Sequence, residues 1–182
     1  MSQNDSTRAL LSGSGGAPDF DHPLEMLAAC HDRIEDRCDL LHRLVDHLAA
    51  SGSDEQAQQA AASVLRHFDT AGEHHHEDEE KNLFPLLREA DPHAARPLVD
   101  ALCADHVAMR EAWQRLRAPL QSLVAGQSVS LEAREVEAFT TLYRDHIARE
   151  EAELLPFARR ILDEEKMREM GAAMARRRGV RA

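Results

Sequence analysis

The sequence predicts an all-α protein, an up-down four-helix bundle built from two helical hairpins with a short C-terminal helix. Aromatic residues make up only 4% of the 182 residues, while Ala, Leu, Glu and Arg are abundant, a composition that favours helices over sheets. Apolar residues recur every three or four positions along four long stretches, as they do on the buried face of a helix. A hydrophobic content of 43% is enough for a folded core.

The charge of the chain restricts its partners. A net charge of −11 disfavours binding to nucleic acid and to anionic membranes, so we expect neither as a partner, and it is compatible with binding cations. No apolar run reaches the roughly 18 residues that a membrane span needs. Residues 1–18 are polar and rich in Gly and Ser, without the apolar core of a signal peptide, which predicts a flexible N-terminal segment and a cytoplasmic protein.

The first helix is expected to begin near Pro23, because proline suits a first helical turn. Its apolar stripe contains one histidine, His31. A break follows at residues 51–53, where Ser53 and Gln56 predict a capping box for the second helix. The full stripe of the first helix reads Leu24, Leu27, His31, Ile34, Cys38, Leu41, Val45 and Leu48.

In the second helix, two polar residues occupy positions where core residues belong. These are His75 and Glu79, which follow Val64 and Phe68 along the stripe. Gly72 and Pro85 lie in the same stretch, so a kink is expected there. A turn at residues 91–92 then ends this helix.

The third and fourth helices show the same substitutions in their stripes. His106 lies in the third, which Pro119 is expected to kink or shorten. A loop over residues 126–130 leads to the fourth helix, with Ser130 as its predicted N-cap. His146 and Glu150 then stand four residues apart on the apolar stripe.

A last helix is predicted over residues 163–178. It ends in a basic tail that we interpret as a solvated helix terminus, because cations suit that end of a helix. The organisation expected is therefore a flexible segment over 1–18, the bundle over 19–165, and the C-terminal helix with its basic tail over 166–182.

The two halves of the chain form a repeat. The His75–Glu79 pair recurs 71 residues later as His146–Glu150, inside a shared pattern H-x-x-x-E-E-x-x-L-(F/L)-P that aligns without a gap. His31 likewise recurs 75 residues later as His106. Two related hairpins pack naturally as an up-down bundle.

The spacing also predicts a metal site. Residues four apart on a helix share a face, so each His–Glu pair points inward. Burying two carboxylates and four imidazoles in one layer is costly unless a cation compensates. Mixed imidazole and carboxylate ligands suit iron, manganese or zinc, and two carboxylates from opposing helices can bridge a dinuclear centre. The ligands predicted on this basis are His31, His75, Glu79, His106, His146 and Glu150.

These residues resemble the hemerythrin family, specifically the bacterial hemerythrin-like or HHE cation-binding domains, over roughly residues 20–165. The resemblance implies a non-haem di-iron centre with bridging glutamates and terminal histidines. Oxygen-carrying members place two histidines four apart on the third helix, whereas Leu102 and Arg110 flank His106 here. His76 is a candidate for the missing ligand, because some members use the residue at that position. Glu80 and Glu151 are expected either to orient an imidazole or to lie on the surface.

Several functions fit this reading. The resemblance implies a cytosolic di-iron protein that binds or senses O2 or NO, with peroxide as a further small ligand. The alternatives are an enzyme acting on peroxide or NO, an iron storage or donation protein, and a metal that only holds the bundle together. Manganese and zinc are possible substitutes for the two iron ions. A surface chelator made by residues 74–80 would not explain the second copy at His146, and the absence of H-E-x-x-H excludes a zinc protease of that class.

Overall fold

The computed structural model describes residues 19–180, and within that range it contains only helices and their connections, which confirms the all-α prediction. The segment 1–18 lies outside the described residues, as do the last two residues of the basic tail. None of the described helices is long and apolar enough to cross a membrane. The elements are α1 (Pro23–Ser51), α2 (Glu55–Arg66), η1 (His67–Gly72), α3 (Glu73–Asp78), η2 (Glu79–Leu83), α4 (Phe84–Ala90), α5 (Pro92–Val124), α6 (Ala133–Arg149), η3 (Glu150–Leu154), α7 (Leu155–Ile161) and α8 (Glu164–Arg177), where η marks a π-helical segment.

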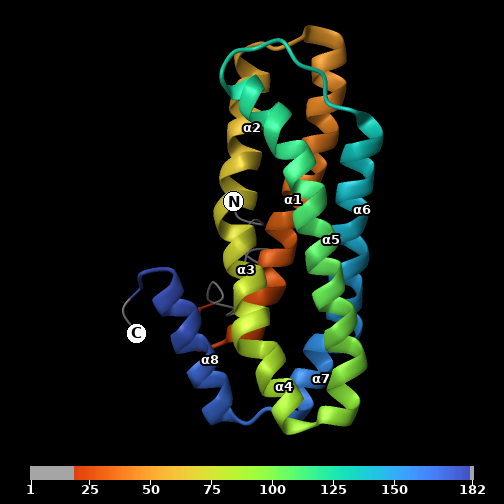
Figure 1. Cartoon of the computed structure of the whole chain (residues 1–182). Helices are drawn as coiled ribbons and strands as arrows, with labels where there is room; N and C mark the ends of the chain where they lie inside the picture. Colours follow the sequence, from red (N-terminus) through yellow and green to blue (C-terminus); the bar gives the residue numbers. More distant parts are fainter. Residues whose placement is uncertain (1–18, 181–182) are drawn as a thin grey trace, which may run out of the picture.

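The bundle has four rods. The first is α1 and the third is α5, while the second runs continuously from α2 through α4 and the fourth from α6 through α7, each with π-helical turns inside it (Figure 1). The rods alternate in direction, and the pairs α1–α2, α2–α5, α5–α6 and α6–α1 are in contact, which closes a square (Figure 1). This is the up-down arrangement that the repeated hairpins predict.

The core is divided into two apolar clusters. One cluster fills the end of the bundle that holds the loop between α5 and α6, and it includes Leu41, Phe68, Trp113 and Phe139. The other fills the opposite end, where α4 and α7 meet, and it includes Leu27, Phe84 and Leu102 together with residues of α8. Along every rod, buried polar side chains separate the residues of one apolar cluster from those of the other. They include His31, His75, His76, Glu79, His106, His146 and Glu150.

Two predicted helix caps are wrong in detail. The N-cap of α2 is Asp54, whose carboxylate accepts from the Ala57 N–H at 2.9 Å, and Ser53 instead accepts from the Val129 N–H. An aspartate at this position satisfies the same free N–H groups as a serine and also favours the helix dipole. The fourth helix begins after Glu132 rather than Ser130, so the connection is longer than expected.

The third helix is not shortened by its proline. Both Pro97 and Pro119 lie inside α5, which continues to Val124. Pro119 falls in the last two turns, where a missing hydrogen bond weakens few others and where packing against the apolar end of the bundle holds the helix together.

The C-terminal helix α8 folds back along the bundle beside α3 and α4 (Figure 1). Asp163 caps its start by accepting from the Lys166 N–H, close to the predicted boundary. Gly171 allows a close approach, because a Cβ atom there would lie 1.8 Å from the carbonyl oxygen of Phe20.

The basic end of α8 is not solvated as expected. Arg177 and Arg178 both bond the carboxylate of Asp78, which is 0% exposed and directly precedes Glu79. Arg177 also donates to the side-chain oxygen of Asn82 at 2.9 Å. A buried carboxylate requires such partners, and the two guanidinium groups supply them from a remote part of the chain.

We predict that the double substitution Arg177→Ala and Arg178→Ala lowers the free energy of unfolding by about 3 kcal/mol, because it leaves the Asp78 carboxylate buried without a cation. Chemical denaturation of the purified protein measures this. Arg176→Ala is the control, since Arg176 is exposed and is expected to cost no more than about 0.5 kcal/mol. Equal losses in both variants would contradict the role assigned to the Asp78 contacts.

The pH dependence of stability has a separate source in His67. Burial, with Arg37 and Arg33 nearby, lowers the pKa of His67 to about 4, and its Nε2 atom is buried without a hydrogen-bond partner. An unfolded histidine titrates near 6.5. Between pH 6.5 and 4 the unfolded state therefore takes up a proton that the folded state refuses, and the free energy of unfolding falls as the pH falls.

We expect the melting temperature of the metal-free protein to drop less between pH 7 and pH 4.5 in a His67→Gln variant than in the wild type, because the glutamine does not titrate. Calorimetry at the two pH values measures the difference. The same drop in both proteins would show that His67 does not contribute.

Candidate metal centre

The two ligand-bearing turns share an unusual backbone. In both copies of the repeat the glutamate opens a π-helical turn, so the Phe84 N–H bonds the Glu79 carbonyl and the Leu155 N–H bonds the Glu150 carbonyl, five residues back. Pro85 and Pro156 follow directly. A proline cannot donate to the carbonyl four residues before it, and its ring would clash there, so a wider turn accommodates it. The kink expected near Pro85 is thus a π turn, and a further π-helical segment, η1, ends at Gly72.

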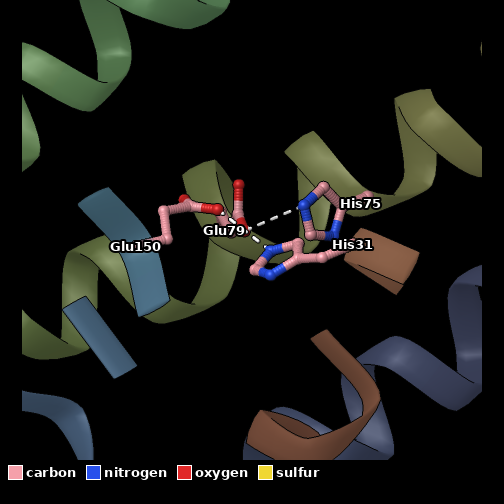
Figure 2. Close-up of side chains that lie close together, drawn as sticks. All are labelled: His31, His75, Glu79 and Glu150. Atoms are coloured by element: carbon pink, nitrogen blue, oxygen red, sulfur yellow. Dashed lines mark ion pairs between the residues drawn. The ribbon is translucent and has the colours of Figure 1, made fainter. Parts of the chain in front are cut away.

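The first half of the candidate site consists of His31 from α1 and His75 from α3, facing the two carboxylates. The Nε2 atom of His31 lies 3.1 Å from Oε2 of Glu150, and the Nε2 atom of His75 lies 3.3 Å from Oε1 of Glu79. Figure 2 shows these four side chains pointing toward one another from three rods. One ligand atom from each lies within 4.8 Å of the others.

The second half consists of His106 from α5 and His146 from α6, facing the other oxygens of the same carboxylates. His106 Nε2 is 3.2 Å from Oε2 of Glu79, and His146 Nε2 is 3.1 Å from Oε1 of Glu150. These four residues also present ligand atoms within 4.8 Å of one another. Each glutamate therefore offers one oxygen to each half, as a bridging carboxylate would.

The hydrogen bonds behind the imidazoles fix their protonation. The Nδ1 atom of His106 lies 2.8 Å from a Glu80 oxygen, and that of His31 lies 3.1 Å from a Glu151 oxygen. A carboxylate can only accept, so Nδ1 carries a proton, and in the neutral imidazole Nε2 is left with a lone pair. Both residues contact an imidazole, as the first of the two roles considered for them requires, while Glu151 also lies on the surface with its side chain 52% exposed.

Asp105 is a third such partner, and it was not predicted from the sequence. Its carboxylate lies 3.4 Å from Nδ1 of His146 and 2.6 Å from the guanidinium of Arg149. The sequence feature that could have identified Asp105 is its position next to His106. An acidic residue next to a buried site residue on one rod is well placed to reach the imidazole of the neighbouring rod, as Glu80 next to Glu79 and Glu151 next to Glu150 also do.

A cation is needed to reconcile these positions. The Nε2 atoms of His106 and His146 face each other at 3.1 Å, although both carry lone pairs. The six side chains are at most 1% exposed, and several of their polar atoms have no hydrogen-bond partner, among them both oxygens of Glu150 and both nitrogens of His75. Two ligand atoms bound at about 2.1 Å and at right angles lie about 3 Å apart, which fits the observed separation.

Burial lowers the pKa values of two imidazoles, which is the direction that metal binding needs, and raises the pKa of one carboxyl group. It lowers the pKa of His75 well below its usual range, and with the neighbouring His146 it lowers that of His106 to about 4, so both are neutral at pH 7. Burial and the adjacent Glu150 carboxylate raise the pKa of Glu79 far above its usual range. The metal-free site therefore holds a proton on Glu79, which a bound cation would displace.

His31 and Glu150 shift in the opposite sense. Burial acts to lower the pKa of His31, but the carboxylates of Glu150 and Glu151 outweigh it and raise the value. Burial likewise acts to raise the pKa of Glu150, but the imidazoles around it, His146 foremost, hold it well below the usual range. These shifts favour an ionic contact between His31 and Glu150 in the metal-free site.

His76 is buried but lies outside both groups of four ligand atoms. Its ring stacks on His106 with the centroids 4.1 Å apart, and the centroid of His146 is 6.5 Å away, so it borders the second half. Neither of its nitrogens has a partner, and burial lowers its pKa. The structure thus brings six of the seven predicted residues together and places the seventh beside them. Its ligation remains a prediction.

An aromatic cluster covers this side of the site. Tyr143 stacks on His76 at 5.8 Å and packs against Phe68 at 5.3 Å, and Phe68 in turn contacts Trp113 at 5.0 Å. Leu102, one turn before His106, is fully buried in the apolar cluster, and Arg110, one turn after it, bonds Glu80, so neither takes the place of the missing histidine.

The comparisons with known proteins agree with this geometry. The family model for the hemerythrin HHE cation binding domain matches residues 22–158. An uncharacterized protein of Haemophilus influenzae is 32% identical over 162 residues, which covers 89% of this chain and 93% of that protein. With its helical bundle and its buried layer of histidines and glutamates, the chain belongs to the hemerythrin HHE cation-binding family.

Proposed function

We propose that this protein holds two non-haem iron ions in a carboxylate-bridged centre and binds or senses a small ligand such as O2 or NO. The observation that carries the proposal is the sharing of Glu79 and Glu150 between two groups of ligand atoms, with one oxygen of each carboxylate directed to each group. A mononuclear site would need one such group and would leave the other half of the carboxylates unpaired in a buried layer.

The residues present fit the proposed ions. His31 and His75 would hold one ion, His106 and His146 the other, and the two glutamates would bridge. Imidazole with carboxylate suits iron, and also manganese or zinc as substitutes. Bound iron would supply a redox-active Lewis acid. Glu80, Asp105 and Glu151 would hold three of the imidazoles in orientation, and burial excludes bulk water from the site.

The burial of the site favours a ligand with no more than two non-hydrogen atoms. The ligand side chains are nearly inaccessible, and a surface groove of about 710 Å³ beside α5 and α7, which is lined by Arg149, Pro156 and Phe157 among others, contains none of them. O2, NO, peroxide and water are small enough to reach such a centre through fluctuations of the helices, whereas a larger substrate is not.

The ligand count favours an open position. In place of a second histidine on α5 the chain has Leu102 and Arg110, so the second half gains a third imidazole only if His76 turns toward it. This supports binding of an exogenous ligand, and it keeps an enzyme acting on peroxide or NO as the second candidate. Cys30, Cys38 and Cys103 are all free thiols, which supports the proposal of a cytoplasmic protein.

We predict that His146→Ala and Glu150→Ala each remove at least half of the bound metal, because each deletes a ligand to the shared centre. His93→Ala is the control, since His93 is exposed and distant from the six residues. Elemental analysis of proteins purified side by side measures metal per chain. The assignment fails if all three variants keep the wild-type content.

The functional proposal is tested by the electronic spectrum of the freshly isolated protein. We expect two iron ions per chain and near-ultraviolet absorption from an oxo-bridged pair, with a colour change on exposure of the reduced protein to O2 or NO that reverses when the gas is removed. Irreversible oxidation with consumption of peroxide would favour the enzyme. Loss of iron to a mild chelator would favour storage, and one colourless, inert ion would contradict the proposal.

A further inference from the structure

The two halves of the site differ in what supports their imidazoles. In the second half, both imidazoles have a carboxylate at Nδ1, from Glu80 at 2.8 Å and from Asp105 at 3.4 Å. Each carboxylate is itself held by an arginine, Arg110 at 2.9 Å and Arg149 at 2.6 Å. The imidazoles are therefore backed by charges that are fixed in place.

The first half is supported less well. The partner of His31 is Glu151, whose side chain is 52% exposed and to which the ion pairs of residues 19–180 give no cation other than His31. His75 has no such support, because its Nδ1 atom is buried without a hydrogen bond. The Nδ1 atom of His31 thus has a solvated carboxylate as its partner, and the Nδ1 atom of His75 has none.

One position in the repeat accounts for the difference. His31 corresponds to His106, so the residue that corresponds to Asp105 is Cys30. The Cys30 side chain is buried, and its Sγ atom lies 3.0 Å from a guanidinium nitrogen of Arg33. A thiol is a weak acceptor and cannot replace a carboxylate behind an imidazole. The arginine that would hold an acid at this position is nevertheless present.

We propose that the centre binds its two metal ions with unequal affinity, so that the second half, His106 with His146, holds the tight ion and the first half, His31 with His75, holds an exchangeable one. The inference rests on the proposed dinuclear centre. A carboxylate behind a ligating histidine fixes the ring and its tautomer and makes Nε2 more basic, and loss of such a partner typically costs about 10–100-fold in metal affinity. The unsupported His75 therefore weakens the first half.

Titration of the metal-free full-length protein with Co²⁺, in competition with a chromophoric chelator, tests this. We expect two dissociation constants that differ by about tenfold or more. Asp105→Asn should raise the lower constant by about tenfold or more, because it removes the charge behind His146. Asp100→Asn, an exposed acid on the same helix, is the matched control and should change neither constant.

A second variant tests the proposal through a gain of metal affinity instead of a loss. Cys30→Asp restores the carboxylate of the repeat beside Arg33 and should lower the higher constant by about tenfold, toward the value of the tight site. Cys30→Ser, which adds no charge, should leave it unchanged. Circular dichroism shows whether each variant retains the wild-type helix content before titration.

The outcomes separate this inference from the function on which it rests. Two equal constants in the wild type, or an Asp105→Asn variant that weakens only the looser site, would overturn the unequal affinity and leave the dinuclear centre standing. A protein that binds no Co²⁺, or a single ion, would refute the dinuclear centre and with it the inference.

Discussion

The structure depends on a layer of ionisable side chains buried across the middle of an apolar bundle. Two apolar clusters drive folding from either end, but the layer between them contains two carboxylates and five imidazoles with almost no exposure. Such groups destabilise a dry core unless each is paired or bound to a cation. The free energy of folding and the binding of metal are therefore linked, and the same residues serve both.

The repeat shows how the chain positions two carboxylates symmetrically. Each glutamate is the first residue of a π turn that accommodates the proline that follows it, so the backbone widens at the point where the side chain must face two partners. Because the device occurs once in each hairpin, the approximate two-fold relation of the hairpins brings the glutamates together from opposite rods. Rotation of either glutamate side chain would keep its contact with one half of the site and break its contact with the other.

Much of this arrangement could be predicted from the sequence, because the periodicity of the stripes and the repeat of His–Glu pairs are both local signals. The six residues that meet in the layer were identified from their positions on the stripes alone. Asp54 and Glu132 were missed as caps because several polar residues near each helix start could serve equally well. Contacts between distant elements, such as that of Asp78 with Arg177, have no local signal at all.

For His76 and Asp105 the sequence contains a local signal, but that signal is incomplete. His76 neighbours a predicted ligand, but whether its ring turns toward the second half depends on its stacking between His106 and Tyr143, which only the packed structure reveals. Asp105 reaches an imidazole on another rod, and the relative rotation of two rods about their axes cannot be obtained from either sequence stretch by itself.

The aromatic cluster gives the protein an intrinsic optical reporter. Trp113 is the only tryptophan in the chain, and it lies two turns beyond His106 on α5, about 10 Å along the axis, with Phe68 and Tyr143 between it and His76. A coloured or paramagnetic ion at that distance quenches the fluorescence of tryptophan. The intensity of tryptophan fluorescence from an unlabelled sample therefore reports the metal occupancy of the centre, in real time and without a dye.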